Sequence, residues 1–94
     1  MTNWRHFRRS LYREALIHIQ AGGIAVHDSG MEWAGKKTAH LLASSMEGLF
    51  EAAAKVSLAK KYLQMTPKPH FDLFGGPLKR AMKLCSQEIK EKAS

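Results

Sequence analysis

The sequence predicts an all-α protein, a small bundle of three to four helices with a proline- and glycine-rich loop before the last helix. Apolar side chains recur at helical spacing in several segments of the chain. Serine precedes glutamate by three residues at two places, which is the spacing of a helix-starting capping box. The length of 94 residues fits one domain, so residues 1–94 are expected to form a single helical unit.

A first helix is expected over residues 1–21. Thr2 or Asn3 can cap its start, and Gly22-Gly23 can end it, because glycine adopts a left-handed stop at little steric cost. The segment "IAVHDSG" that follows is expected to be a connector. The apolar positions on one side of this helix are Trp4, Phe7, Leu11, Ala15 and Ile19.

The middle of the chain, residues 30–64, is expected to hold either one long helix or two. Ser29 and Glu32 have the capping-box spacing, which places a helix start near residue 30. Ser44 and Glu47 repeat that spacing. Two alternatives therefore stay open: one helix runs through, or it breaks near Ser44 and a third helix begins there.

Residues 65–77 are expected to form an extended loop. Pro67 and Pro69 cannot continue a helix, and Gly75-Gly76 interrupt the backbone pattern further. A last helix is expected over residues 77–92, with a proline at its first position, where the missing N–H costs nothing. Its apolar positions are Leu78, Ala81, Met82, Cys85 and Ile89.

The charge balance is strongly basic, with 15 Lys and Arg against 8 Asp and Glu and a formal net charge of +7. This favours an acidic partner, which can be nucleic acid, anionic lipid or an acidic protein. The single cysteine, Cys85, rules out an internal disulfide framework. The first residues are rich in arginine and free of acids, which is typical of a mitochondrial targeting segment or of a basic helix that begins there.

The residue types that carry catalysis are not arranged for it along the sequence. No two of the histidines stand at the spacing of a known metal motif, so no metal site is expected. His27-Asp28-Ser29 has the residue types of a hydrolase triad, but adjacent residues cannot adopt the geometry of one. No catalytic residue is predicted, and the protein is not expected to be an enzyme. The histidines are His6, His18, His27, His40 and His70.

A basic strip and a short motif carry the functional prediction. Arg5, Arg9 and Arg13 recur every four residues, so on a helix they would share one flank. The motif Leu11-Tyr12-Arg13, with Leu16 three residues later, stands inside this segment. In a short basic chain it resembles the LYR-motif family of small mitochondrial proteins. A looser similarity to the tail of a family member in respiratory complex I covers residues 60–77.

The resemblance implies a helical bundle that binds the mitochondrial acyl carrier protein, an acidic partner that presents an acyl-phosphopantetheine group. No cofactor of the protein's own is implied. Carrier-binding residues would then be Arg5, Arg9, Leu11, Tyr12, Arg13 and Leu16. The acyl-chain pocket would include Leu11, Leu16 and Phe50. Contacts to a neighbouring subunit would come from Pro67, Pro69, Phe71 and Phe74.

The function expected from the resemblance is that of a noncatalytic accessory subunit of a respiratory-chain complex, with complex I as the first choice. Such a protein would lie on the matrix side of the inner mitochondrial membrane, peripheral to it, with no nucleic acid bound. One alternative is an assembly factor for iron-sulfur enzymes or for the mitochondrial ribosome. An alternative of another class, favoured by the net charge, is a small basic RNA-binding or ribosomal protein.

Overall fold

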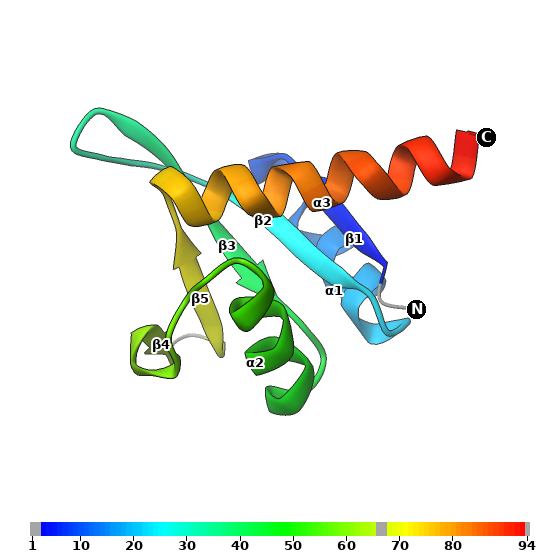
Figure 1. Ribbon diagram of the computed structural model, residues 1–94, viewed down its shortest axis with the longest axis horizontal. Coiled ribbons are helices and arrows are strands. Elements are labelled where there is room, and N and C mark those ends of the chain that lie inside the picture. The colour runs from blue at the N-terminus through cyan, green and yellow to red at the C-terminus, as the bar shows by residue number, and fades with distance from the viewer. Residues whose placement is uncertain (1–2, 66–67, 94) are drawn as a thin grey trace.

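The computed structural model describes residues 3–65 and 68–93, with the side chains described through residue 87. It is an α/β protein with a five-stranded mixed sheet and three α-helices (Figure 1). The prediction of an all-α bundle is therefore wrong. The strand order is β1-β2-β3-β5-β4; β1 and β2 are parallel, and the other neighbours are antiparallel.

The segment expected to be the first helix begins as a strand. It divides into β1 (Trp4–Phe7), a 3-10 turn η1 (Arg9–Leu11) and α1 (Tyr12–Gln20). Trp4 and Phe7 have helical spacing, but in a strand this spacing points them to opposite faces. Both are buried because this part of the sheet is covered on both sides. The parallel pairing of β1 with β2 requires a crossover connection, which α1 provides.

The expected connector and the start of the expected second helix form a long hairpin instead. Its strands are β2 (Ile24–Trp33) and β3 (Lys36–Leu42). Ala34 and Gly35 lie between them, with φ of 52° and 78°. Two consecutive positive φ values are the signature of the tight turn whose twist matches a β-hairpin.

Ser29 belongs to this hairpin and does not cap a helix. Its Oγ accepts a hydrogen bond from the Met31 N–H at 3.0 Å and lies 2.6 Å from Thr38 Oγ1 on the facing strand. The pairing register of the two strands shifts between Asp28 and Glu32. A serine that bonds its own backbone two residues on supports such a bulge as well as it supports a helix start, so the capping-box prediction at Ser29 is wrong.

Only part of the second half of the expected middle helix forms, as α2 (Met46–Lys55), which ends nine residues before the expected residue 64. Its cap is Ser45, whose Oγ accepts from the Gly48 N–H at 3.0 Å. This cap is one residue later than the expected Ser44. Neither of the two alternatives for residues 30–64 holds, because the chain before Ser44 forms strands β2 and β3 instead of a helix. A 3-10 turn η2 (Lys60–Tyr62) and the short β4 (Leu63–Gln64) follow.

The region expected to be a loop contains an inner strand, β5 (His70–Leu73), which lies between β3 and β4. Helix α2 ends at Lys55, well before this region, and the residues after Pro69 extend the sheet. Pro67 lies outside the described residues. The last helix, α3 (Gly75–Ala93), starts two residues before the expected position.

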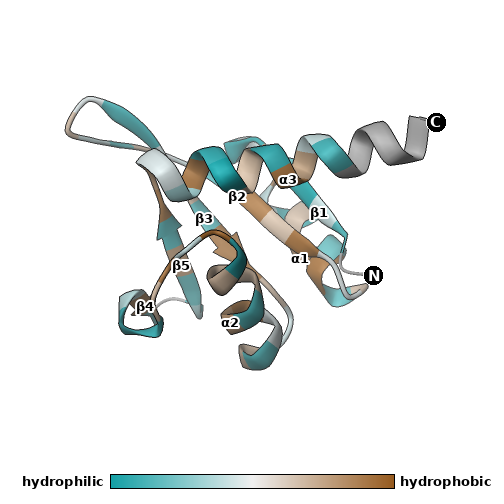
Figure 2. Cartoon of the chain, viewed as in Figure 1, coloured by the Kyte–Doolittle hydropathy of each residue, from teal (hydrophilic) through white to brown (hydrophobic). Residues whose placement is uncertain are grey.

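The two faces of the sheet are covered unequally. Helices α2 and α3 pack on one face over the larger apolar cluster, which is brown along the facing strands in Figure 2. On the other face α1 packs with β1 and β2 over a smaller cluster of Phe7, Ala15, Ile19, Ala25 and Leu42. None of the helices among the described residues is long and apolar enough to cross a bilayer.

Candidate metal site

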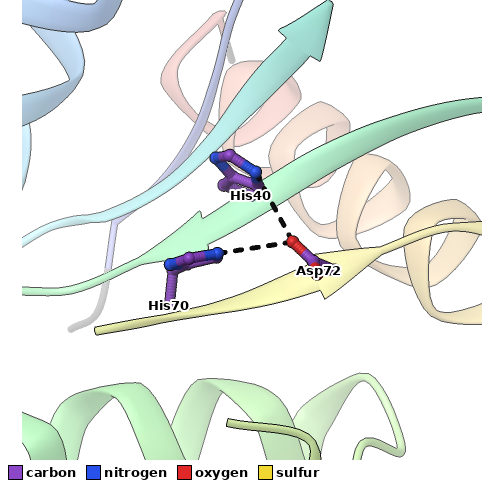
Figure 3. Close-up of side chains that lie close together, drawn as sticks. All are labelled: His40, His70 and Asp72. Carbon is purple, nitrogen blue, oxygen red and sulfur yellow. Dashed lines mark ion pairs between the residues drawn. The ribbon is translucent and has the colours of Figure 1, made fainter. Parts of the chain in front are cut away.

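Helix α1 covers only part of its face of the sheet, and polar side chains occupy the uncovered part of that face. Backbone pairing aligns His27 on β2 with His40 on β3, and His40 with Asp72 on β5. His70 lies two residues before Asp72 and therefore points to the same face. These strands thus gather His40, His70 and Asp72 from two distant segments of the chain, as Figure 3 shows.

The three side chains turn their ligand atoms toward one another. Asp72 Oδ1 lies 3.4 Å from His40 Nε2 and 3.4 Å from His70 Nε2. The two imidazole rings lie 4.4 Å apart between centroids, and the three ligand atoms all fall within 4.8 Å of one another. The Asp72 side chain is 49% exposed and that of His70 is 9% exposed. The cluster is therefore anchored on one side and open on the other.

The two 3.4 Å separations suit metal ligands better than they suit hydrogen bonds. Hydrogen bonds between nitrogen and oxygen are usually 2.7–3.2 Å long. Zinc bonds of about 2.0–2.1 Å in a tetrahedral site place neighbouring ligand atoms ~3.3–3.4 Å apart. By contrast, His6 Nε2 and Asp28 Oδ1 form a simple pair at 2.8 Å. The cluster therefore differs from an ordinary His–Asp contact in this same chain.

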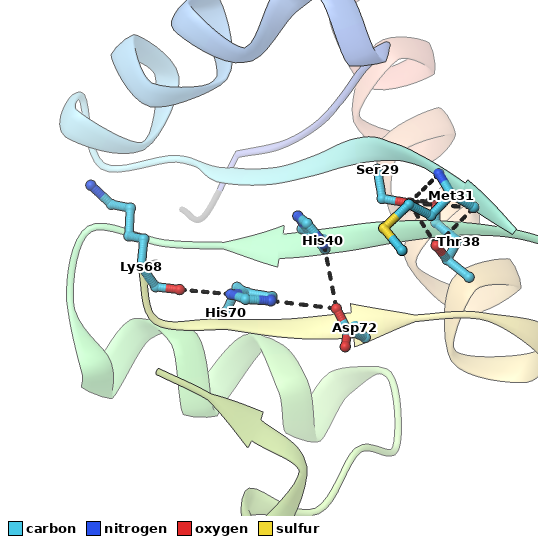
Figure 4. Close-up of polar contacts among 7 residues, drawn as sticks. All are labelled: Ser29, Met31, Thr38, His40, Lys68, His70 and Asp72. Atoms are coloured by element: carbon cyan, nitrogen blue, oxygen red, sulfur yellow. Dashed lines mark hydrogen bonds and ion pairs between the residues drawn. The ribbon is translucent and has the colours of Figure 1, made fainter. Parts of the chain in front are cut away.

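His70 is held in the orientation that a metal ligand needs. Its Nδ1 lies 2.6 Å from the carbonyl oxygen of Lys68, as Figure 4 shows. A carbonyl can only accept, so Nδ1 carries a proton, and in the neutral ring the lone pair is then on Nε2, which faces Asp72. Metal-binding histidines usually donate their other ring N–H to a carbonyl or carboxylate in this way.

The charge state of His40 also favours metal binding. Burial lowers the pKa of His40 below its ordinary value of 6.5, and the neighbouring His70 lowers this pKa further. Asp72 acts in the opposite direction, and His27 lowers the pKa as well. Neutral imidazole is the form that binds metal ions, so His40 is ready to bind at neutral pH.

His27 closes the cluster on the side of α1. Its Nε2 donates to the carbonyl oxygen of Arg9 at 2.9 Å, and its ring lies 5.1 Å from the ring of Tyr12. The residue is buried, and its Nδ1 has no hydrogen-bond partner among the described residues. His27 pairs with His40 across β2 and β3, so this unsatisfied ring lies in the strand next to the cluster.

The basic strip expected on the first helix is not assembled. Arg5 lies on β1, where its guanidinium is 5.5 Å from the ring of Phe7. Arg9 lies in η1, and its side chain packs against Gly30. A Cβ atom at position 30 would lie only 2.4 Å from Arg9 Cδ. Arg13 is exposed on α1. The three arginines thus sit on three different elements.

The expected acyl-chain pocket is divided by the sheet. Leu11 and Leu16 pack on the small cluster under α1, while Phe50 packs on the larger cluster under α2 and α3. Tyr12 is partly exposed at the start of α1. The structure therefore keeps Leu11 and Leu16 near each other but does not bring Phe50 to them.

The expected subunit contacts have different environments. Phe71 is fully buried in the core, so its ring is not on the surface. Phe74 is exposed and packs on Trp33. Pro69 is half-buried just before β5, while Pro67 is outside the described residues.

Comparison of the chain with protein-family models, with curated proteins and with solved structures finds no match. The family suggested by Leu11-Tyr12-Arg13 thus stays a prediction. The fold that the resemblance implied is not the fold of this chain.

The cluster escaped prediction because its members are far apart in sequence. The available signal was "HFD", in which His70 and Asp72 alternate across a short apolar residue as they would on one face of a strand. The third member, His40, comes from another strand. It joins them only through the pairing of β3 with β5.

Proposed function

We propose that the protein binds a divalent transition-metal ion, with zinc as the first candidate. The ligand atoms are His40 Nε2, His70 Nε2 and Asp72 Oδ1. The observation that carries the proposal is the pair of 3.4 Å separations around Asp72 Oδ1, which match the edge of a tetrahedral metal site. Two imidazoles and one carboxylate are a donor set used for zinc and for ferrous iron.

Three protein ligands leave at least one coordination position for water or another oxygen ligand. The exposure of Asp72 keeps that position accessible from solvent. A metal ion in such a setting lowers the pKa of bound water and polarises oxygen ligands such as phosphate. The site is thus proposed as a functional metal centre that accepts an external ligand.

The test is calorimetric titration of chelator-treated protein with zinc. The wild-type chain is expected to bind one zinc ion, and His40→Ala and Asp72→Asn are each expected to weaken binding by at least ~100-fold. His6→Ala is the matched control, since it removes a histidine that pairs with an aspartate without a third ligand. Absence of stoichiometric binding by the wild type, or equal loss in His6→Ala, would contradict the proposal.

Acyl-carrier-protein binding, with its mitochondrial location and respiratory complex, stays a separate hypothesis from the sequence. Its support is the exposure of Tyr12 and Arg13 at the start of α1, which leaves them free to contact an acidic protein. Capture of an acyl carrier protein that is lost in Arg13→Glu would support it. Capture that persists unchanged in this variant would refute it.

A further inference from the structure

An exposed pair of aromatic rings lies beside the metal site. Trp33 is 62% exposed and Phe74 is 41% exposed, yet their rings pack with centroids 4.9 Å apart. Trp33 comes from the end of β2, at the tip of the hairpin that projects beyond the sheet in Figure 1. Phe74 directly follows β5. Two large rings held together at the surface form a platform, called here the Trp33–Phe74 platform.

The platform and the metal site share one face of the sheet. Trp33 pairs with Lys36, and Lys36 lies on the same face as His40, four residues later on β3. Contact with Trp33 places Phe74 on that face too, in line with the alternation from Asp72. With a strand rise of ~3.3 Å per residue, Phe74 lies only ~6.6 Å along the chain from Asp72.

Positive charge lies close to the platform. Lys36 is exposed beside Trp33. A groove of about 600 Å³ along the hairpin is lined in part by Arg8, Arg9 and Lys37, although Lys37 alternates with Lys36 and so points to the opposite face of the sheet. Asp28 and Glu32 also line it, and Asp28 is already paired with His6. The chain as a whole carries a net charge of +7, so a polyanion is favoured over a neutral ligand.

We propose that this face binds single-stranded nucleic acid, with a base stacked on the Trp33–Phe74 platform and a neighbouring phosphate directed to the metal site. Sequence-tolerant binding of single strands combines exposed aromatic rings with a basic surface, and both are present here within a few residues. The phosphate contact rests on the proposed metal centre. The stacking contact does not, because Trp33 and Phe74 need no metal.

The experiment measures fluorescence anisotropy of a labelled oligothymidylate with zinc-loaded and with chelated protein. Stacking of one base corresponds to ~5- to ~150-fold in affinity, so Trp33→Ala and Phe74→Ala are each expected to lose at least ~5-fold in both states. The matched control is Tyr62→Ala, which removes an exposed ring beside Lys61 at another site. This control is expected to bind as the wild type does.

The outcomes separate the two proposals. Platform-dependent binding by the chelated protein, without any zinc effect, would keep the nucleic-acid surface and remove the phosphate–metal contact. No binding at low salt would overturn the inference, and so would equal losses in Trp33→Ala and Tyr62→Ala, which would mean unspecific charge attraction. A change of oligomeric state in Trp33→Ala, with no effect on oligothymidylate, would assign the platform to a second copy of the chain and overturn the inference.

Discussion

His70 donates its Nδ1–H to the carbonyl oxygen of Lys68 at 2.6 Å, and this contact turns Nε2 toward Asp72. The acceptor is a backbone atom just before β5, so the start of the strand fixes the ring. The neutral ring of His70 in the metal-free protein is therefore expected to be the tautomer protonated at Nδ1. Long-range proton–nitrogen NMR spectra distinguish the two ring nitrogens. Protonation at Nε2 in these spectra would contradict the assigned geometry.

The lowered pKa of His40 makes the stability of the metal-free protein depend on pH. Burial and the nearby His70 lower this pKa below 6.5, so near and below pH 6.5 the unfolded chain binds more protons than the folded chain. The contribution of His40 to the free energy of unfolding is therefore greatest above pH 6.5. It is lost as the pH falls below 6.5 and through the pKa of the folded state. The effect is measured as the melting temperature of chelator-treated protein between pH 8 and pH 5, a range that brackets the titration of an ordinary histidine.

The matched variant for the pH experiment is His40→Gln, which keeps a polar side chain of similar size and cannot titrate. It is expected to flatten the pH dependence of the melting temperature. An unchanged slope in this variant would show that another group is responsible, and the environment assigned to His40 would be wrong.

A substitution in the turn of the β2–β3 hairpin tests the fold, because the hairpin and the helix expected from the sequence predict opposite changes in the free energy of unfolding. Ala34 has a φ of 52°, which asparagine tolerates better than alanine. Ala34→Asn creates Asn-Gly, the favoured pair for this turn, and is expected to stabilise the protein by about 0.5–1 kcal/mol in urea unfolding. In the helix expected from the sequence, the same change would destabilise, because asparagine has a lower helix propensity than alanine.

Two aromatic residues three positions apart are expected to respond very differently to truncation. Phe71 is fully buried in the core under α2 and α3, so Phe71→Ala is expected to cost about 3–5 kcal/mol. Phe74 is partly exposed and packs mainly on Trp33, so Phe74→Ala is expected to cost less than ~1.5 kcal/mol. Denaturant unfolding of both variants gives the comparison. Similar costs would mean that the faces of β5 are assigned wrongly.

The predictions from the sequence succeeded where the local signal and the fold agree. The helices that begin at Met46 and Gly75 are signalled locally, by a serine before the first and by Pro77 in the first turn of the second, and both carry an apolar stripe. The prediction for the first segment failed because Trp4 and Phe7 have the spacing of two residues buried on one side of a helix. In the structure Trp4 is buried on the face covered by α2 and α3, and Phe7 is buried on the opposite face under α1.

The hairpin and the site were missed for a related reason. Ser29 and Glu32 have the spacing of a helix start, and only the pairing with Thr38 reveals a bulge. Likewise His40 and Asp72 become neighbours through strand pairing. Register between distant strands depends on the whole sheet and cannot be read from the spacing of residues along one segment.

Zinc K-edge X-ray absorption of the one-to-one zinc complex reads out the ligand set of the metal site itself. We expect four-coordinate zinc with only nitrogen and oxygen donors at about 2.0–2.1 Å, including two imidazoles. In Asp72→Asn and His40→Ala this pattern is expected to disappear. A spectrum with sulfur at about 2.3 Å, or one without imidazole scattering, would rule out His40, His70 and Asp72 as the ligands.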